Sequence, residues 1–138
     1  MSEQREGKAT ILVADDNNDA RSLLIFWLEQ NGYHTLQAGD GQAADEIARR
    51  ERPDLVLMDI SMPHVDGFIA ARRIHSHDEL SSIPVVAITA LIAEEVRSAA
   101  LEAGCAEVIQ KPIDYGYLSE VLERLLRGGA RAVSRMGS

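Results

Sequence analysis

Short runs of apolar residues alternate with longer amphipathic segments along this chain. The apolar runs, such as ILVA at 11–14 and LVLM at 55–58, contain no polar residue, which is typical of strands buried on both faces. The longer segments repeat apolar residues every three or four positions, which is typical of helices that pack by one face. The predicted strands are 9–14, 33–38, 54–59, 84–90 and 106–110, and the predicted helices are 17–32, 40–51, 66–77, 92–104 and 114–127.

These elements form five strand-then-helix units with no internal repeat. Buried strands of this kind belong to a parallel sheet with helices on both faces, and the crossovers between them must be right-handed. The strand at 33–38 alternates apolar and polar residues, so we expect it at an edge of the sheet. The chain is therefore predicted to be an α/β protein with a doubly wound, five-stranded parallel sheet in the order 2-1-3-4-5, which is a flavodoxin-like topology.

Residues with strong capping preferences mark the ends of several predicted helices. Asn17 or Asn18 is expected to cap the first helix at its N-terminus, and Asp40 the second. Gly32 and Gly104 are expected to stop two helices at their C-termini.

Composition and charge restrict the classes of protein to which the chain can belong. Its 138 residues, 46% of them hydrophobic, suit one domain, which we place at 9–127 between flexible segments at 1–8 and 128–138. A net charge of -8 argues against non-specific binding to nucleic acid or to anionic membranes. A single cysteine, a polar N-terminus and the lack of a long apolar segment predict a cytoplasmic protein without disulfides.

Polar residues follow the carboxyl ends of four strands that are contiguous in the predicted sheet, where ligands bind in folds of this kind. Three carboxylates in one cleft repel one another unless a cation or a proton neutralises them. A site that offers only oxygen ligands selects a hard ion, and Mg²⁺ is the natural occupant. A hydroxyl and an ammonium group suit the oxygens of a phosphoryl group. These strand-end residues are Asp15, Asp16, Asp59, Thr89 and Lys111.

Asp59 is the carboxylate that we expect to react. With a divalent ion in place, one carboxylate can act as a nucleophile and form an aspartyl phosphate. Asp15 and Asp16 are adjacent, so they can share a cation, whereas Asp59 stands alone on the central strand and faces Thr89 and Lys111. The main-chain carbonyl of Ser61 is a further candidate ligand. Taken alone, Asp15 and Asp16 could also cap the first helix.

Four motifs together resemble the receiver domain of two-component response regulators. They are VADDN at 13–17, LVLMDISMPHVDG at 55–67, AITA at 87–90 and QKPI at 110–113. Any one of them is unspecific, but their order and spacing are highly specific. The resemblance implies that Asp59 accepts a phosphoryl group from a histidine kinase or a phosphotransfer protein. It also implies that Mg²⁺ is bound directly by Asp16, Asp59 and the main-chain carbonyl of Ser61, and through water by Asp15.

The same resemblance assigns roles to the other strand ends. It implies that Thr89 and Lys111 contact the phosphoryl oxygens, and that the Lys111–Pro112 peptide bond is cis. Phosphorylation would then remodel the face made by the fourth helix, the fifth strand and the fifth helix. Receivers often carry an aromatic residue on the fifth strand at the position of Val108, so the usual switch between Thr89 and an aromatic ring is altered here.

These observations favour a stand-alone receiver that is not an enzyme acting on separate substrates and whose output is binding to a downstream protein. A receiver excised from a hybrid histidine kinase remains an alternative. A Mg²⁺-dependent aspartyl-phosphate phosphatase is less favoured, because such enzymes place their nucleophile in a D-x-D pattern after the first strand and Asn17 occupies the third place of that pattern. A flavin-binding protein is disfavoured because the acidic loop after the first strand would repel a phosphate. His75 and His77 are interpreted as solvated side chains.

Overall fold

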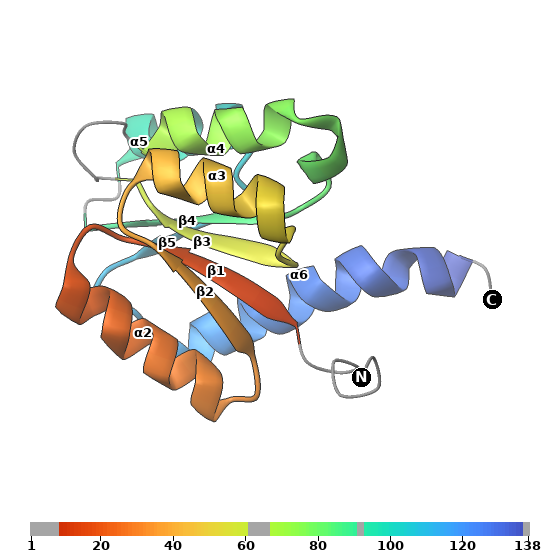
Figure 1. Ribbon diagram of the computed structural model, residues 1–138, viewed down its shortest axis with the longest axis horizontal. Coiled ribbons are helices and arrows are strands. Elements are labelled where there is room, and N and C mark those ends of the chain that lie inside the picture. The colour runs from red at the N-terminus through yellow and green to blue at the C-terminus, as the bar shows by residue number, and fades with distance from the viewer. Residues whose placement is uncertain (1–8, 61–66, 91–92, 137–138) are drawn as a thin grey trace.

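One parallel sheet lies between two layers of helices in the computed structural model, which describes residues 9–60, 67–90 and 93–136 (Figure 1). The strand order is β2-β1-β3-β4-β5, so the predicted fold is confirmed. The strands are β1 (Thr10–Ala14), β2 (His34–Ala38), β3 (Leu55–Asp59), β4 (Val85–Thr89) and β5 (Glu107–Gln110). The helices are α2 (Asn18–Gln30), α3 (Gly41–Glu51), α4 (Gly67–Ser76), α5 (Glu94–Glu102) and α6 (Tyr115–Met136), with a short 3-10 helix η1 (Asp78–Leu80).

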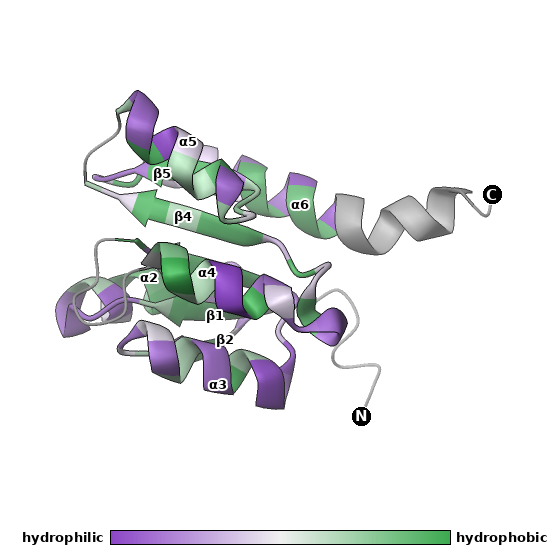
Figure 2. Cartoon of the chain, turned by 90° about the horizontal axis from the view of Figure 1, so that it is seen from above, coloured by the Kyte–Doolittle hydropathy of each residue, from purple (hydrophilic) through white to green (hydrophobic). Residues whose placement is uncertain are grey.

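The sheet divides the interior into two hydrophobic cores, because successive side chains of a strand point to opposite faces. On β1, Leu12 and Ala14 join the core beneath α3, α4 and α5, whereas Ile11 and Val13 join the core beneath α2 and α6. Every residue of β3 and β4 is buried. Figure 2 shows this pattern: the strands are hydrophobic, and the helices that cover them are hydrophilic on their outer sides. The three central strands are therefore held firmly, and their carboxyl ends are fixed relative to one another.

Capping side chains set the boundaries of the helices next to the site. Asn17 rather than Asn18 caps α2, and its side chain accepts a hydrogen bond of 2.8 Å from the main-chain N–H of Ala20. Asp40 caps α3 in the same way through Ala43. Gly32 and Gly104 follow the ends of α2 and α5 with φ angles of +89° and +98°, so both predicted stops are confirmed.

The last helix is longer than the sequence indicates. The sequence predicts a helix at 114–127 followed by a Gly- and Arg-rich tail that frays. Instead, α6 continues to Met136 and extends past the edge of the sheet (Figure 1). The flexibility of 128–138 remains a prediction, and residues 1–8 lie outside the described part of the chain. None of the described helices has the length and apolar character needed to cross a bilayer.

Two histidines are more engaged than the sequence suggests. His75 and His77 are half-buried, not solvated. The Nε2 atom of His75 lies 2.9 Å from the main-chain oxygen of Ile83, and that of His77 lies 3.1 Å from Oδ1 of Asp45. Both contacts join α4 and the segment after it to neighbouring parts of the fold, so these residues serve packing.

Candidate functional site

Three aspartates converge at the carboxyl ends of two adjacent strands. Asp15 and Asp16 follow β1, and Asp59 is the last residue of β3, which pairs with β1 in parallel register. One carboxylate oxygen from each of the three lies within 4.8 Å of the others. Asp15 and Asp59 are each 5% exposed, whereas Asp16 faces solvent. The topology thus gathers three acidic groups into one half-buried cluster, as the strand ends predict.

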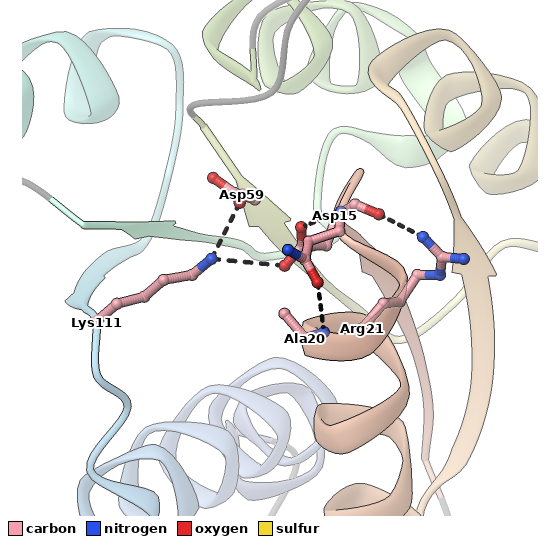
Figure 3. Close-up of polar contacts among 6 residues, drawn as sticks. Asp15, Ala20, Arg21, Asp59 and Lys111 are labelled. Atoms are coloured by element: carbon pink, nitrogen blue, oxygen red, sulfur yellow. Dashed lines mark hydrogen bonds and ion pairs between the residues drawn. The ribbon is translucent and has the colours of Figure 1, made fainter.

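Lys111 brings a positive charge to this cluster from the end of β5 (Figure 3). Its Nζ atom lies 3.1 Å from Oδ2 of Asp59 and 3.6 Å from Oδ2 of Asp15. The main-chain N–H of Lys111 donates a hydrogen bond of 2.8 Å to the carbonyl of Thr89, so the ends of β4 and β5 are held together. The Lys111–Pro112 peptide bond is cis, as the family resemblance implies.

The charges of the cluster act on one another at short range. Burial raises the pKa of the Asp15 carboxyl, and the negative charges of Asp59 and Asp16 add to this shift. A hydrogen bond from the main-chain N–H of Asn17 and the charge of Lys111 oppose it without cancelling it. For Lys111, burial lowers the pKa, but the hydrogen bonds and charges of Asp59 and Asp15 together outweigh burial and raise it. Lys111 is therefore a stable cation at neutral pH, and it does not fully neutralise the acidic groups.

The raised pKa of Asp15 predicts a specific pH dependence of stability. A carboxyl that binds protons more tightly when folded stabilises the fold below its unfolded pKa, near 3.8, and this contribution is lost as the pH rises through the folded pKa. In the presence of EDTA, the unfolding free energy of the wild type minus that of Asp15→Asn should therefore fall as the pH rises above 3.8. Urea denaturation over a pH series measures this difference.

Asp19→Asn is the matched control for that experiment, because Asp19 is an exposed aspartate in the first turn of α2. It removes one negative charge from the same part of the chain, so it controls for the loss of charge alone. A difference for Asp15→Asn that stays constant, or that grows with pH, would contradict the raised pKa.

The remaining residues singled out in the sequence are placed differently. Thr89 is the last residue of β4 and 5% exposed, and its neighbour Ile88 pairs with Asp59, so Thr89 lies at the same edge of the sheet as the cluster. Val108 is the second residue of β5 and belongs to the core beneath α3, α4 and α5. Ser61, the predicted main-chain ligand, lies outside the described residues.

The loop that carries Asp15 and Asp16 is fixed by contacts that the sequence does not reveal. Arg21, in the first turns of α2, donates a hydrogen bond of 2.6 Å to the main-chain oxygen of Asp15 (Figure 3). It also donates one of 2.9 Å to the side chain of Gln37, on β2. An arginine soon after an acidic pair only weakly predicts such a contact from the sequence. The partner of Arg21 on β2, Gln37, is 16 residues away in the chain.

The donor set of the cluster fits a hard divalent cation. Its ligands are carboxylate oxygens alone, and two of the three aspartates are buried, where unneutralised negative charge is unfavourable. Oxygen-only sites with few protein ligands are typical of Mg²⁺, which retains waters and can bind a phosphoryl oxygen. With a lysine beside one of the carboxylates, the arrangement can support phosphoryl transfer to that carboxylate.

Comparison with known proteins gives one consistent result. Residues 11–123 match the family described as response regulator receiver domain. The polar-differentiation response regulator DivK of Brucella anthropi is 33% identical over 117 residues, which are 85% of this chain and 95% of DivK. Protein PilH of Pseudomonas aeruginosa is 35% identical over 120 residues, which are 87% of this chain and 99% of PilH.

A solved structure agrees with these sequence matches. The receiver domain of the sensor histidine kinase PA1611 from Pseudomonas aeruginosa, solved with a magnesium ion coordinated in its active site cleft, is similar with a TM-score of 0.81 and 30% identity. The similarity covers 86% of this chain and 98% of that domain.

Proposed function

Because the chain belongs to the response regulator receiver family, we propose that it is a stand-alone receiver that accepts a phosphoryl group on Asp59 and thereby switches its binding to a protein partner. The observation that carries this proposal is the position of Lys111, whose Nζ atom lies 3.1 Å from Asp59 within a cluster of three aspartates. DivK and PilH, which match this chain over nearly their whole length, support the stand-alone form. The PA1611 domain, which comes from a sensor histidine kinase, keeps the excised form as an alternative.

The proposed donor is a phosphohistidine of a histidine kinase or a phosphotransfer protein. A carboxylate oxygen of Asp59 forms a bond to phosphorus while the bond from phosphorus to the histidine nitrogen breaks, and the imidazole leaves with the electron pair and takes up a proton. Lys111 and the hydroxyl of Thr89 contact the phosphoryl oxygens and stabilise the charge that they carry.

A magnesium ion supplies the remaining charge neutralisation when it is bound. In this proposal its ligands are Asp16, Asp59 and the main-chain carbonyl of Ser61, with Asp15 holding the ion through a water molecule. The oxygen-only cluster and the magnesium ion of the PA1611 domain support this assignment. The chain's own chemistry is then limited to the gain and loss of one phosphoryl group, without turnover of a separate substrate.

The output surface in this proposal is formed by α5, β5 and α6, with Thr89 and Val108 as switch positions. Among the described residues, a surface pocket of about 420 Å³ lies here, lined by residues of all three elements, including Arg97, Val108 and Tyr117. Tyr117 and Arg124 both donate hydrogen bonds to the carboxylate of Glu107, at 2.5 Å and 2.8 Å. The net charge of -8 favours a protein partner over nucleic acid or a membrane surface. In this proposal the two proteins meet in the cytoplasm.

Phosphorylation by a small donor tests the proposal without knowledge of the kinase. The protein is incubated with acetyl phosphate and Mg²⁺, and its intact mass is measured. We expect one added phosphoryl group per chain, and none when EDTA removes the metal, because three acidic groups repel an anionic donor unless a cation is present.

The same incubation distinguishes the phosphatase alternative. Continuous release of phosphate from a range of phosphate esters, without the mass increase, would contradict the receiver proposal. Labelling that is equally strong in EDTA would contradict the role of the metal. To test the switch, the affinity of the receiver for its protein partner is measured with and without beryllofluoride, a phosphoryl mimic. Equal affinities would contradict phosphorylation-dependent binding.

A further inference from the structure

We propose that Arg21 is a positioning residue that holds the acidic loop between β1 and α2 in the geometry required for metal binding. This inference rests on the proposed function, because it concerns the magnesium site of the receiver. Arg21 lies one helical turn into α2 and is half-buried. Its side chain points back toward the loop that carries Asp15 (Figure 3).

The guanidinium group of Arg21 joins three parts of the chain at once. It donates hydrogen bonds to the main-chain oxygen of Asp15 at 2.6 Å, to the side chain of Asn18 at 2.6 Å and to the side chain of Gln37 at 2.9 Å. A planar group with several donors in a fixed arrangement suits such a junction, and a lysine ammonium does not reproduce it. The loop is thereby tied both to α2 and to β2.

The contact with the Asp15 oxygen fixes the peptide unit between the two acidic residues of the loop. The main-chain N–H of Asp15 donates a hydrogen bond of 3.1 Å to the carbonyl of Ala38, so Arg21 supplies the second anchor of the main chain of this residue. The side chain of Asp16 is exposed and makes no hydrogen bond or ion pair with the described residues. The direction of the Asp16 carboxylate therefore depends on the main chain that Arg21 holds.

Arg21 acts through this main-chain contact, because its guanidinium bonds the main-chain oxygen of Asp15, Asn18 and Gln37. Loss of Arg21 releases the loop and also removes a positive charge near the acidic cluster. Because the lost charge by itself would favour binding of a cation, weaker Mg²⁺ binding would report on the position of the loop. Groups that orient metal ligands from outside the ligand set typically change metal affinity by about 10-fold to 100-fold when they are removed.

Isothermal titration of the intact protein with MgCl₂ tests the proposal by a direct binding measurement. We expect the Kd of Arg21→Met for Mg²⁺ to rise about 10-fold. Gln37→Ala, an exposed change that removes one anchor of the guanidinium, should raise the Kd by a smaller factor, and Arg21→Lys should lie between Arg21→Met and the wild type. Arg50→Met is the matched control, because Arg50 is exposed on α3 and pairs only with its neighbour Glu51 among the described residues.

The outcomes separate this inference from the proposed function. Weaker Mg²⁺ binding in Arg21→Met and Gln37→Ala, with unchanged binding in Arg50→Met, supports the positioning role. Equal Kd values for Mg²⁺ in the wild type, Arg21→Met and Gln37→Ala would overturn the positioning role, even if the wild type is phosphorylated normally. A wild type that neither binds Mg²⁺ nor accepts a phosphoryl group would instead overturn the proposed function. Urea denaturation in the titration buffer, before MgCl₂ is added, confirms that each variant is folded.

Discussion

Replacing Asp59 with asparagine is expected to abolish phosphorylation by acetyl phosphate completely. The amide has no anionic oxygen to attack phosphorus, so the covalent bond cannot form. The change keeps the shape of the side chain, and the amide oxygen can still accept a hydrogen bond from Lys111, which lies 3.1 Å from Oδ2 in the wild type. Loss of labelling in a folded Asp59→Asn protein, measured by intact mass, would therefore report on the nucleophile and not on the fold.

Asp54→Asn is the matched control, since Asp54 precedes the opposite end of the same strand. Its carboxylate is exposed and accepts a hydrogen bond from the main-chain N–H of Thr10 at 2.8 Å, far from the cluster in the sheet. Asp54→Asn should be labelled as the wild type is. Labelling of Asp59→Asn at the wild-type level, with the phosphoryl group mapped to Asp15 or Asp16, would overturn the assignment of the nucleophile.

The strand-end residues were predictable because their positions follow from the fold alone. Uninterrupted apolar runs identify the central strands, and a doubly wound order brings the carboxyl ends of those strands together. Asp15, Asp59 and Lys111 then must lie near one another whatever the surrounding side chains do, and the structure confirms this. The role proposed for the main-chain carbonyl of Ser61 stays a prediction, because Ser61 lies outside the described residues.

Contacts between side chains that are distant in the chain were not predictable in this way. Arg21 contacts Gln37 only because β1 and β2 pair in one particular register, and no sequence pattern around either residue predicts the contact. The polar stretch around His75 predicts a solvated side chain, yet its ring is held by the carbonyl of Ile83. Periodicity identifies which face of a helix is buried, but not which polar groups find partners at its margins.

Gly32 and Gly104 also show that the sequence does not reveal contacts between distant residues. Both are predicted to end a helix, but their surroundings in the fold differ. Each follows a helix with positive φ, and each donates its main-chain N–H to a carbonyl three residues earlier, Glu29 at 3.1 Å and Leu101 at 3.0 Å. This is the arrangement of a glycine C-cap. A Cβ atom at position 32 would meet nothing within 4 Å, whereas one at 104 would overlap Nδ1 of His75 and lie 3.0 Å from its Cε1.

Gly104→Ala should therefore destabilise the protein far more than Gly32→Ala. Both variants lose about 1–2 kcal/mol because an L-residue is placed at positive φ. Gly104→Ala loses roughly a further 1–3 kcal/mol from overpacking, because His75 cannot move aside without giving up its 2.9 Å contact with Ile83. Urea denaturation of the two variants measures the difference directly.

The double variant His75→Ala/Gly104→Ala identifies the source of that difference. If the overlap with the imidazole is responsible, the change Gly104→Ala should cost no more in the His75→Ala background than Gly32→Ala costs in the wild type. A penalty that is undiminished by His75→Ala, or equal penalties for the two single glycine changes, would contradict the steric explanation. Gly104 precedes β5 at the end of the sheet opposite the acidic cluster, so folded Gly104→Ala should bind Mg²⁺ with the wild-type Kd. Stability and metal binding would then be separable within one small domain. Gly104 lies at the amino ends of the strands, whereas the acidic cluster lies at their carboxyl ends.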